Sequence, residues 1–438
     1  MNATTLASEP AAPIGVRGRT RLLFINRSYW PDTEATGQLL TELCEDLAAT
    51  GDFDVHVLCG QPNHVSIKDM QVDAEASQHN GVTIHRARHL TFNKRSMPGK
   101  LLNLVSFTLA AWRMSGRLPK SDIVITETDP FFLGFLGRSI QKRRGSRFIA
   151  YLQDLYPDIA VACGKVRETW LIRRLRKLLF RAYSAADRVV VLSRDMKDRC
   201  VENGVDAGRI AIIPNWSDVT SLFPVKTNNA FRREHGLEDK FVVMYSGNMG
   251  VPHLLEPILD AAAQLASETE IVFYFVGGGV QKQPLEEAAK QRGLGNVRFL
   301  PYQPKAFLSQ SLSAGDVQIV SVKPGVISCL MPSKVYGVLA AGCPVLAIAP
   351  ASSELGEMIA AFRFGKVCDP SSGALAADLV QAIREIRQTE DPSLPERAYR
   401  FVTENASRRS QVDRFAELLR SMTAPPLHRS SVVPTAAH

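Results

Sequence analysis

The sequence predicts an α/β protein built from two successive doubly wound parallel sheets. Short apolar stretches rich in β-branched residues alternate with amphipathic stretches of helical period along most of the 438 residues. This alternation is typical of parallel strands joined by crossover helices, which cover both faces of a sheet. The pattern pauses near residue 220 and then restarts, so we expect one domain at 20–222 and a second at 223–407, followed by a helix at 408–422.

Composition restricts the partners and the compartment. The net charge of +8 favours acidic partners, namely nucleotides, anionic lipid head groups or nucleic acid. The seven cysteines are dispersed, without zinc spacing, which is typical of buried thiols in a reducing cytoplasm. Residues 1–19 lack the apolar core of a signal peptide, no apolar run is long enough to span a bilayer, and residues 423–438 have a disordered composition. We therefore expect a cytoplasmic protein whose membrane contact is peripheral.

The first half begins with a strand at 21–26, a long loop at 27–37 and an amphipathic helix at 38–50. The loop lacks the G-x-G-x-x-G of dinucleotide-binding folds, which argues against a dehydrogenase. Further strands are expected at 55–59, 82–86, 122–126, 148–152, 188–193 and 210–213, with helices at 100–117, 131–144 and 170–185.

Polar residues follow two of these strands. Asp129 lies just after strand 122–126, and Asp154 lies just after strand 148–152. The carboxyl ends of the strands in an open parallel sheet are where ligands bind. Asp154 is therefore a candidate site residue, and its catalytic role is implied by the family resemblance given below; the alternative is an aspartate that caps the next turn.

The helix at 170–185 carries a stripe of leucines, and arginines and lysines occupy the rest of its surface. One interpretation places it on an anionic membrane surface. The other is an ordinary core-facing helix with a solvated basic face. The apolar helix at 100–117, which follows the basic loop 92–95, has basic ends as well.

In the second half, strand 241–245 leads into Ser246-Gly247-Asn248-Met249-Gly250, a loop able to bring backbone amides near a phosphate. Strand 271–276 precedes the glycines 277–279, which are either a second such loop or simply a strand-to-helix turn. In the first half, His56, His85 and His89 are interpreted as strand or loop histidines and not as metal ligands, and no metal site is expected.

The stretch 316–350 organises the second half. Strand 317–322 ends at Lys323, and Pro332 suits the first turn of a helix that continues to Ala341. Ser333 and Lys334 then lie where free amides attract an anion. We interpret this as the phosphate-holding half of a nucleotide site, the alternative being a plain strand-helix-strand unit with a solvated Lys334.

Several motifs in a fixed order resemble the retaining GT-B glycosyltransferases of family 4, in particular the branch that builds bacterial colanic acid and O-antigen polysaccharides. They are YWPDTEATG, YLQDLYPD, VVVLSRDM, IIPNWSD, VMYSGNMG, FVGGG, NVRFLPY, MPSKVYGVLAAGCPV and SSELGEMI. The resemblance covers about residues 20–422. It implies two Rossmann-like domains that face each other across a cleft, with 408–422 crossing back to brace the first.

The resemblance also implies roles for single residues. Asp154 would face the reacting sugar, and Trp30 and Asp129 would bind the acceptor in the N-terminal domain. Donor binding would fall to Gly37, Ser246, Gly247, Asn248, Gly250, Gly278, Ser333, Lys334 and Glu354. Cys329 and Gly337 stand where the family typically has two glutamates, so the contacts of those glutamates are missing or supplied elsewhere.

The implied function is retaining transfer of a sugar from a nucleotide-diphosphate sugar to a polyprenyl-diphosphate-linked saccharide acceptor in exopolysaccharide or O-antigen biosynthesis. It would occur at the cytoplasmic membrane face, reached through the basic N-terminal-domain helices, without metal, other cofactor or nucleic acid. Two alternatives remain open. The missing glutamates fit a non-catalytic nucleotide-sugar-binding partner subunit, and the fold also fits a sugar-nucleotide epimerase or phosphorylase.

Overall fold

The computed structural model describes residues 18–32, 35–62, 76–90, 92, 97–389 and 391–423. Residues 1–17 of the expected leader, the expected tail beyond 423 and residues 93–95 of the basic loop lie outside this range.

The first half folds into a sheet of eight described strands, in the order β3-β4-β2-β1-β5-β6-β7-β8. All neighbours pair in parallel except β3 and β4, which are antiparallel. No strand was expected from the sequence where β3 lies. The strands are β1 (Thr20–Ile25), β2 (Phe53–Cys59), β3 (Ala76–His79), β4 (Val82–Arg86), β5 (Ile123–Thr126), β6 (Arg147–Tyr151), β7 (Arg188–Val191) and β8 (Ile210–Ile212).

Helices connect these strands: α1 (Ala35–Ala49), α2 (Met97–Ser115), α3 (Leu133–Arg144), α4 (Asp158–Ala162), α5 (Trp170–Ser184) and α6 (Arg194–Glu202). Helix α3 packs closely on the sheet, because a Cβ at Gly137 would lie 2.2 Å from the Phe148 ring. Helix α1 begins at Ala35. The prediction that Gly37 belongs to a loop was therefore wrong, since it lies in the first turn of this helix.

The second half holds a fully parallel sheet of six described strands, in the order β11-β10-β9-β12-β13-β14. Alternate residues of β9 enter different cores: Val243 and Tyr245 enter one, Val242 and Met244 another. Helices therefore cover both faces, which confirms the predicted architecture. The strands are β9 (Phe241–Ser246), β10 (Ile271–Val276), β11 (Val297–Leu300), β12 (Val317–Ser321), β13 (Val345–Ile348) and β14 (Gly365–Cys368).

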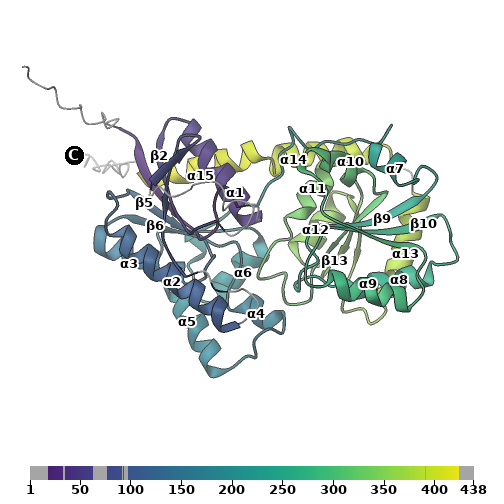
Figure 1. Cartoon of the computed structure of the whole chain (residues 1–438), viewed down its shortest axis with the longest axis horizontal. Helices are drawn as coiled ribbons and strands as arrows, with labels where there is room; N and C mark the ends of the chain where they lie inside the picture. The colour runs from purple at the N-terminus through teal and green to yellow at the C-terminus, as the bar shows by residue number, and fades with distance from the viewer. Residues whose placement is uncertain are drawn as a thin grey trace, which may run out of the picture.

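The helices of this half are α7 (Ala230–Glu234), α8 (Glu256–Gln264), α9 (Lys282–Gln291), α10 (Leu308–Ser313), α11 (Lys334–Ala340), α12 (Glu354–Ala361) and α13 (Leu375–Gln388). Helix α14 (Leu394–Asn405) packs against α11 of the second half, and α15 (Arg408–Thr423) runs back over the first half (Figure 1). The Phe415 ring of α15 lies 5.3 Å from the Tyr151 ring of β6, and Arg408 pairs with Asp46 of α1 at 2.7 Å.

Candidate functional site

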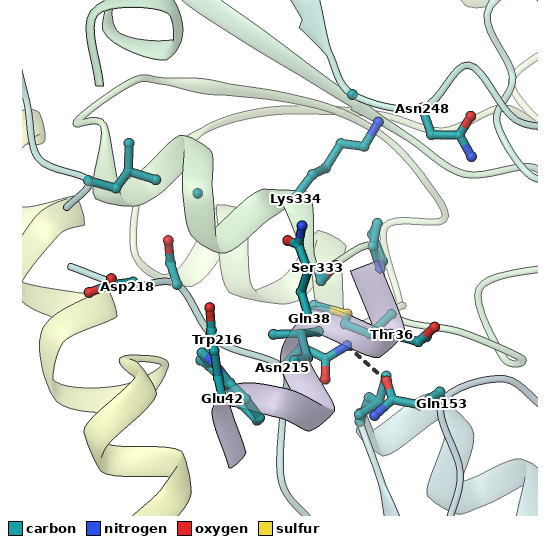
Figure 2. Close-up of a pocket in the computed structure, with 18 of the residues that line it drawn as sticks. Thr36, Gln38, Glu42, Gln153, Asn215, Trp216, Asp218, Asn248, Ser333 and Lys334 are labelled. Atoms are coloured by element: carbon teal, nitrogen blue, oxygen red, sulfur yellow. Dashed lines mark hydrogen bonds between the residues drawn. The ribbon is translucent and has the colours of Figure 1, made fainter. Parts of the chain in front are cut away.

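A cavity of about 540 Å³ lies between the carboxyl ends of the two sheets (Figure 2). This volume is within the range of small-molecule sites. The first half contributes side chains of α1, the tip of β6 and the segment after β8, and the second half contributes the loop after β9 and the start of α11. Its lining includes Thr36, Gln38, Glu42, Gln153, Asp154, Asn215, Trp216, Asp218, Gly247, Asn248, His253, Lys305, Ser333, Lys334 and Gly337.

The amine of Lys334 is buried, although the side chain as a whole is partly exposed, and it has no hydrogen-bond partner among the described residues. It lies 3.7 Å from the centroid of the Tyr245 ring, and a Cβ built on Gly247 would come within 3.4 Å of it. Burial lowers the pKa of Lys334 to about 7, because the charged form is poorly solvated there. An anion in the cavity would raise the pKa again and hold the amine charged.

The loop after β9 approaches the neighbouring glycine loop closely. Gly277 has a φ of +135°, and a Cβ on it would lie only 2.1 Å from the carbonyl oxygen of Gly247. Only glycine combines this backbone conformation with this approach. Gly247 itself has a φ of +128° and borders the cavity beside Asn248, so the predicted phosphate-binding loop faces the amine of Lys334.

Helix α11 begins at Lys334, slightly later than the sequence predicted, because Pro332 and Ser333 form a preceding turn whose carbonyls accept from Val335 and Tyr336. Ser333 borders the cavity, as expected. Gly337 borders it as well, and a Cβ there would contact Leu222 at 3.6 Å. Cys329 is buried instead, and its carbonyl oxygen accepts from the Leu155 amide of the first half at 2.9 Å.

Asp154 stands at the tip of β6, on the wall of the cavity, and its amide donates to the Thr128 hydroxyl at 3.3 Å. Burial, and secondarily the negative charge of Asp129, raise the pKa of Asp154 to about 6. At neutral pH the carboxylate is therefore charged and faces the space between the two halves.

A second chamber of about 270 Å³ adjoins the cavity on the side of the first sheet. It is bordered by Glu127 and Asp129 at the end of β5, and it shares Thr36, Gln153 and Asp154 with the cavity. No sequence pattern singles out Glu127. The nearest signal is its place directly after the buried strand β5, two residues before Asp129.

The other predicted residues lie apart from the main cavity. Asp129 borders the second chamber, where its carboxylate pairs with Arg27 at 3.0 Å. Trp30 stacks on His79 with 3.9 Å between ring centroids and borders neither space. A Cβ on Gly37 would contact Ser28.

Four donor-site candidates are close to the loop or to the other half without lining the cavity. Ser246 ends strand β9, a Cβ on Gly250 would contact the Asn248 amide, and a Cβ on Gly278 would contact the Tyr302 ring at 3.0 Å. Glu354 joins the halves instead: its amide donates to Asp195 at 3.0 Å and its carboxylate accepts from the Arg194 amide. Burial raises the pKa of Glu354.

Within the described part of the chain, no cluster of three or more His, Cys, Asp or Glu side chains is placed to hold a metal ion. No described helix is long and apolar enough to cross a bilayer.

Comparison with known proteins gives consistent results for both halves. Residues 35–216 match the family described as "Glycosyl transferase 4-like domain", and residues 227–401 match "Glycosyl transferases group 1". WcaI of Escherichia coli strain K12, named as a colanic acid biosynthesis glycosyl transferase, is 30% identical over 379 residues, covering 83% of this chain and 92% of WcaI.

Solved structures share the two-sheet GT-B fold. Sucrose-phosphate synthase of Thermosynechococcus elongatus has a TM-score of 0.71 at 18% identity, covering 92% of this chain and 99% of that protein. HepE of Anabaena, solved in complex with UDP and glucose, has a TM-score of 0.66 at 14% identity, covering 92% of this chain and 100% of HepE.

Proposed function

The chain belongs to the glycosyltransferases of family 4, and we propose that it adds a sugar to a lipid-linked saccharide acceptor at a membrane surface. As a member of that family it is a nucleotide-sugar glycosyltransferase of polysaccharide biosynthesis, and members of the family retain the anomeric configuration of the donor sugar. The observation that carries the proposal is the buried amine of Lys334, which has no hydrogen-bond partner in the described part of the chain and borders a cavity that both halves line.

The donor diphosphate fits the second-half wall of this cavity. There the Lys334 amine would offset the charge that develops on the leaving phosphate as its bond to the sugar breaks. The loop at Gly247 and Asn248 and the Ser333 hydroxyl lie on the same wall. Their positions support the donor-binding roles expected for them.

The acceptor fits the first-half wall. In same-face transfer the acceptor oxygen bonds to the anomeric carbon while the bond to the phosphate breaks, and the departing phosphate takes the hydroxyl proton. Asp154 projects from this wall with a charged carboxylate at neutral pH. It would orient the attacking hydroxyl or stabilise positive charge on the sugar ring.

An exposed apolar surface with basic side chains supports the membrane part of the proposal. Helices α2, α3 and α5 pack side by side (Figure 1). On them Trp170 is 69% exposed, Leu171 59% and Leu102 50%. Exposed cations accompany these side chains: Arg113, Lys142, Arg143, Arg173, Arg174, Lys177 and Arg181. Apolar side chains among cations suit an anionic lipid surface, which also carries the lipid-linked acceptor.

The compartment follows from the same proposal. All seven cysteines are free, and burial raises the pKa of the Cys44 thiol well above its usual range. Unreactive free thiols are typical of a reducing compartment. The cytoplasmic face of the membrane is therefore the proposed site of the reaction.

A transfer assay tests the proposal. The purified protein is incubated with UDP-, GDP-, ADP- and dTDP-sugars and polyprenyl-diphosphate-linked saccharides, and products are separated by mass. We expect one sugar nucleotide to yield an acceptor one residue longer, with the anomeric configuration of the donor retained by NMR. Absence of turnover would favour a non-catalytic partner subunit, and a product formed without any acceptor would favour an epimerase.

A further inference from the structure

The chamber beside the main cavity contains an unexplained buried carboxyl group. Glu127 is 3% exposed, and its Oε1 accepts from the Gln153 amide at 3.3 Å. Its Oε2 has no partner among the described residues, although this residue borders the chamber. A buried polar atom without a hydrogen bond destabilises the fold. The proposed reaction assigns no task to this group.

A line of side chains connects this carboxyl to the main cavity. The Asn215 amide donates to Gln153 Oε1 at 3.1 Å, the bond drawn in Figure 2. Because Oε1 accepts from Asn215, the Gln153 amide must point its N–H toward Glu127. Asn215 Oδ1 is the second buried atom of the line that has no hydrogen-bond partner within the described ranges, and Asn215 borders the main cavity. Both ends of the line are thus free to bind a ligand.

Other walls of the chamber indicate the chemistry of that ligand. The Phe131 and Tyr156 rings are stacked, with 5.2 Å between centroids, and both border the chamber. They offer a flat apolar surface beside several hydrogen-bonding groups, as a pyranose ring requires. The Asp154 carboxylate disfavours an anionic ligand, and Arg27, a cation that borders the chamber, is already paired with Asp129 at 3.0 Å.

We propose that this chamber holds the terminal neutral sugar of the acceptor, with a hydroxyl of that sugar hydrogen-bonded to Oε2 of Glu127. The inference rests on the proposed function, whose acceptor site it locates. Asp154 belongs to both spaces, so a sugar in the chamber presents a neighbouring hydroxyl to the donor at their common wall. Glu127 is then an acceptor-binding residue and takes no part in holding the donor.

The protonation state of Glu127 makes the inference testable by pH. Burial raises its pKa to about 8, and the charges of Asp129 and Asp154 contribute in the same direction. The Cys44 thiol and the Tyr151 and Tyr156 phenols near it also have raised pKa values and stay neutral. Arg27 borders the chamber as well, where it pairs with Asp129. At pH 7 the carboxyl is therefore neutral and its O–H can donate to a sugar hydroxyl, whereas above pH 8 that donor is lost.

Acceptor kinetics of Glu127→Gln and Glu127→Ala test the inference, with the exposed Glu202→Gln as a matched control. A glutamine keeps a donor and an acceptor in place of the neutral acid, so its acceptor KM at pH 7 should stay within about threefold of wild type. Glu127→Ala should raise the acceptor KM about tenfold to a hundredfold and leave the donor KM unchanged. Between pH 7 and 9 the acceptor KM should rise in wild type and in Glu202→Gln, and stay level in Glu127→Gln.

An unchanged acceptor KM in Glu127→Ala, or an equal rise in donor and acceptor KM, would overturn the inference. If that variant fails to fold, the pH profiles decide, since parallel profiles of wild type and Glu127→Gln would overturn it as well. A preference for acceptors ending in a uronic acid would contradict the proposed class of sugar. Absence of transfer by the wild type with every acceptor would instead refute the proposed function, and this inference with it.

Discussion

Replacing Lys334 by methionine should weaken donor binding and remove its pH dependence. The methionine keeps the apolar contact with Tyr245 and removes only the charge. A hydrogen bond to a charged group contributes about 1.5–3 kcal/mol, so the Kd of the nucleotide sugar should rise about tenfold to a hundredfold at pH 6. Lys290→Met, at an exposed position of α9, is the matched control.

The pH dependence follows from the lowered pKa of Lys334, about 7 in the empty cavity. A diphosphate needs the charged amine, and the charged fraction falls from about one half at pH 7 to about one hundredth at pH 9 for this pKa. The wild-type Kd should therefore rise about fiftyfold over this interval. His253 also borders the cavity, but burial lowers its pKa to about 4, so it contributes nothing in this range.

Calorimetric titration with the nucleotide selected in the transfer assay measures both effects. In wild type and in Lys290→Met, buffers of different ionisation enthalpy should reveal uptake of a proton on binding above pH 7. Lys334→Met should show neither proton uptake nor the rise in Kd. A wild-type Kd that stays constant from pH 7 to pH 9 would refute the reasoning, and so would an unchanged Kd in Lys334→Met.

The same variant should be more stable than wild type at pH 7. Moving the pKa from about 10.4 in the unfolded chain to about 7 in the folded one costs about 4 kcal/mol at pH 7. The contact with Tyr245 offsets about 0.5–2 kcal/mol of that cost. Between pH 7 and 10 the folded state binds fewer protons at Lys334 than the unfolded state, so the stability of the folded state rises with pH over this interval. The cost is therefore greatest below pH 7 and disappears as pH approaches 10. Urea unfolding should find Lys334→Met about 2–4 kcal/mol more stable at pH 7 and less so at pH 10.

Three further predictions concern the Asp154 carboxylate, the close approach of Gly277 to Gly247 and the exposed surface of α5. Asp154→Asn should lower kcat at least tenfold and abolish the acid limb of the pH–rate profile. Because the pKa of Asp154 is near 6, the wild type loses this carboxylate below that pH. An acid limb that persists in the variant would have to come from another group. Gly277→Ala should lower the free energy of unfolding, measured in urea, by more than about 2 kcal/mol. Gly293→Ala is the control, also at positive φ but with open space around it, and it should lose only about 1 kcal/mol. Equal losses in the two variants would contradict the close approach of Gly277 to Gly247. Leu171→Glu should weaken binding to phosphatidylglycerol vesicles about tenfold or more, with the exposed Val280→Glu of the second half as control; equal binding would exclude α5 from the membrane surface.

Much of the fold could be predicted because parallel strands buried on both faces appear as continuous apolar runs. The strand at 317–322 was predicted from such a run, and β12 ends within one residue of the prediction. The turns at 247 and 277 were predicted from the glycines that follow two other runs of this kind. Helix α1 was placed too late because a glycine near its start resembles loop sequence. Strand β3 was missed because its four residues, Ala76–His79, are polar apart from alanine and lie at the edge of the sheet.

The candidate site was only partly predictable, because it depends on contacts between distant segments. Lys334 was found from its local motif, but the burial of its amine against Tyr245 is a tertiary property. Glu127 is positioned by its hydrogen bond with Gln153, 26 residues later, and no local sequence pattern predicts that pair. Glu354 lies within the motif SSELGEMI, for which the family resemblance implied a donor contact, whereas its carboxylate joins α12 to α6 of the other half.

A structure of the protein with its nucleotide-sugar donor would test the central claim most directly. We expect the diphosphate in the cavity between the two sheets, with a phosphate oxygen about 2.7–2.9 Å from the Lys334 amine, the distance typical of a charge-assisted hydrogen bond. A donor bound with its diphosphate away from Lys334, or outside that cavity, would contradict it.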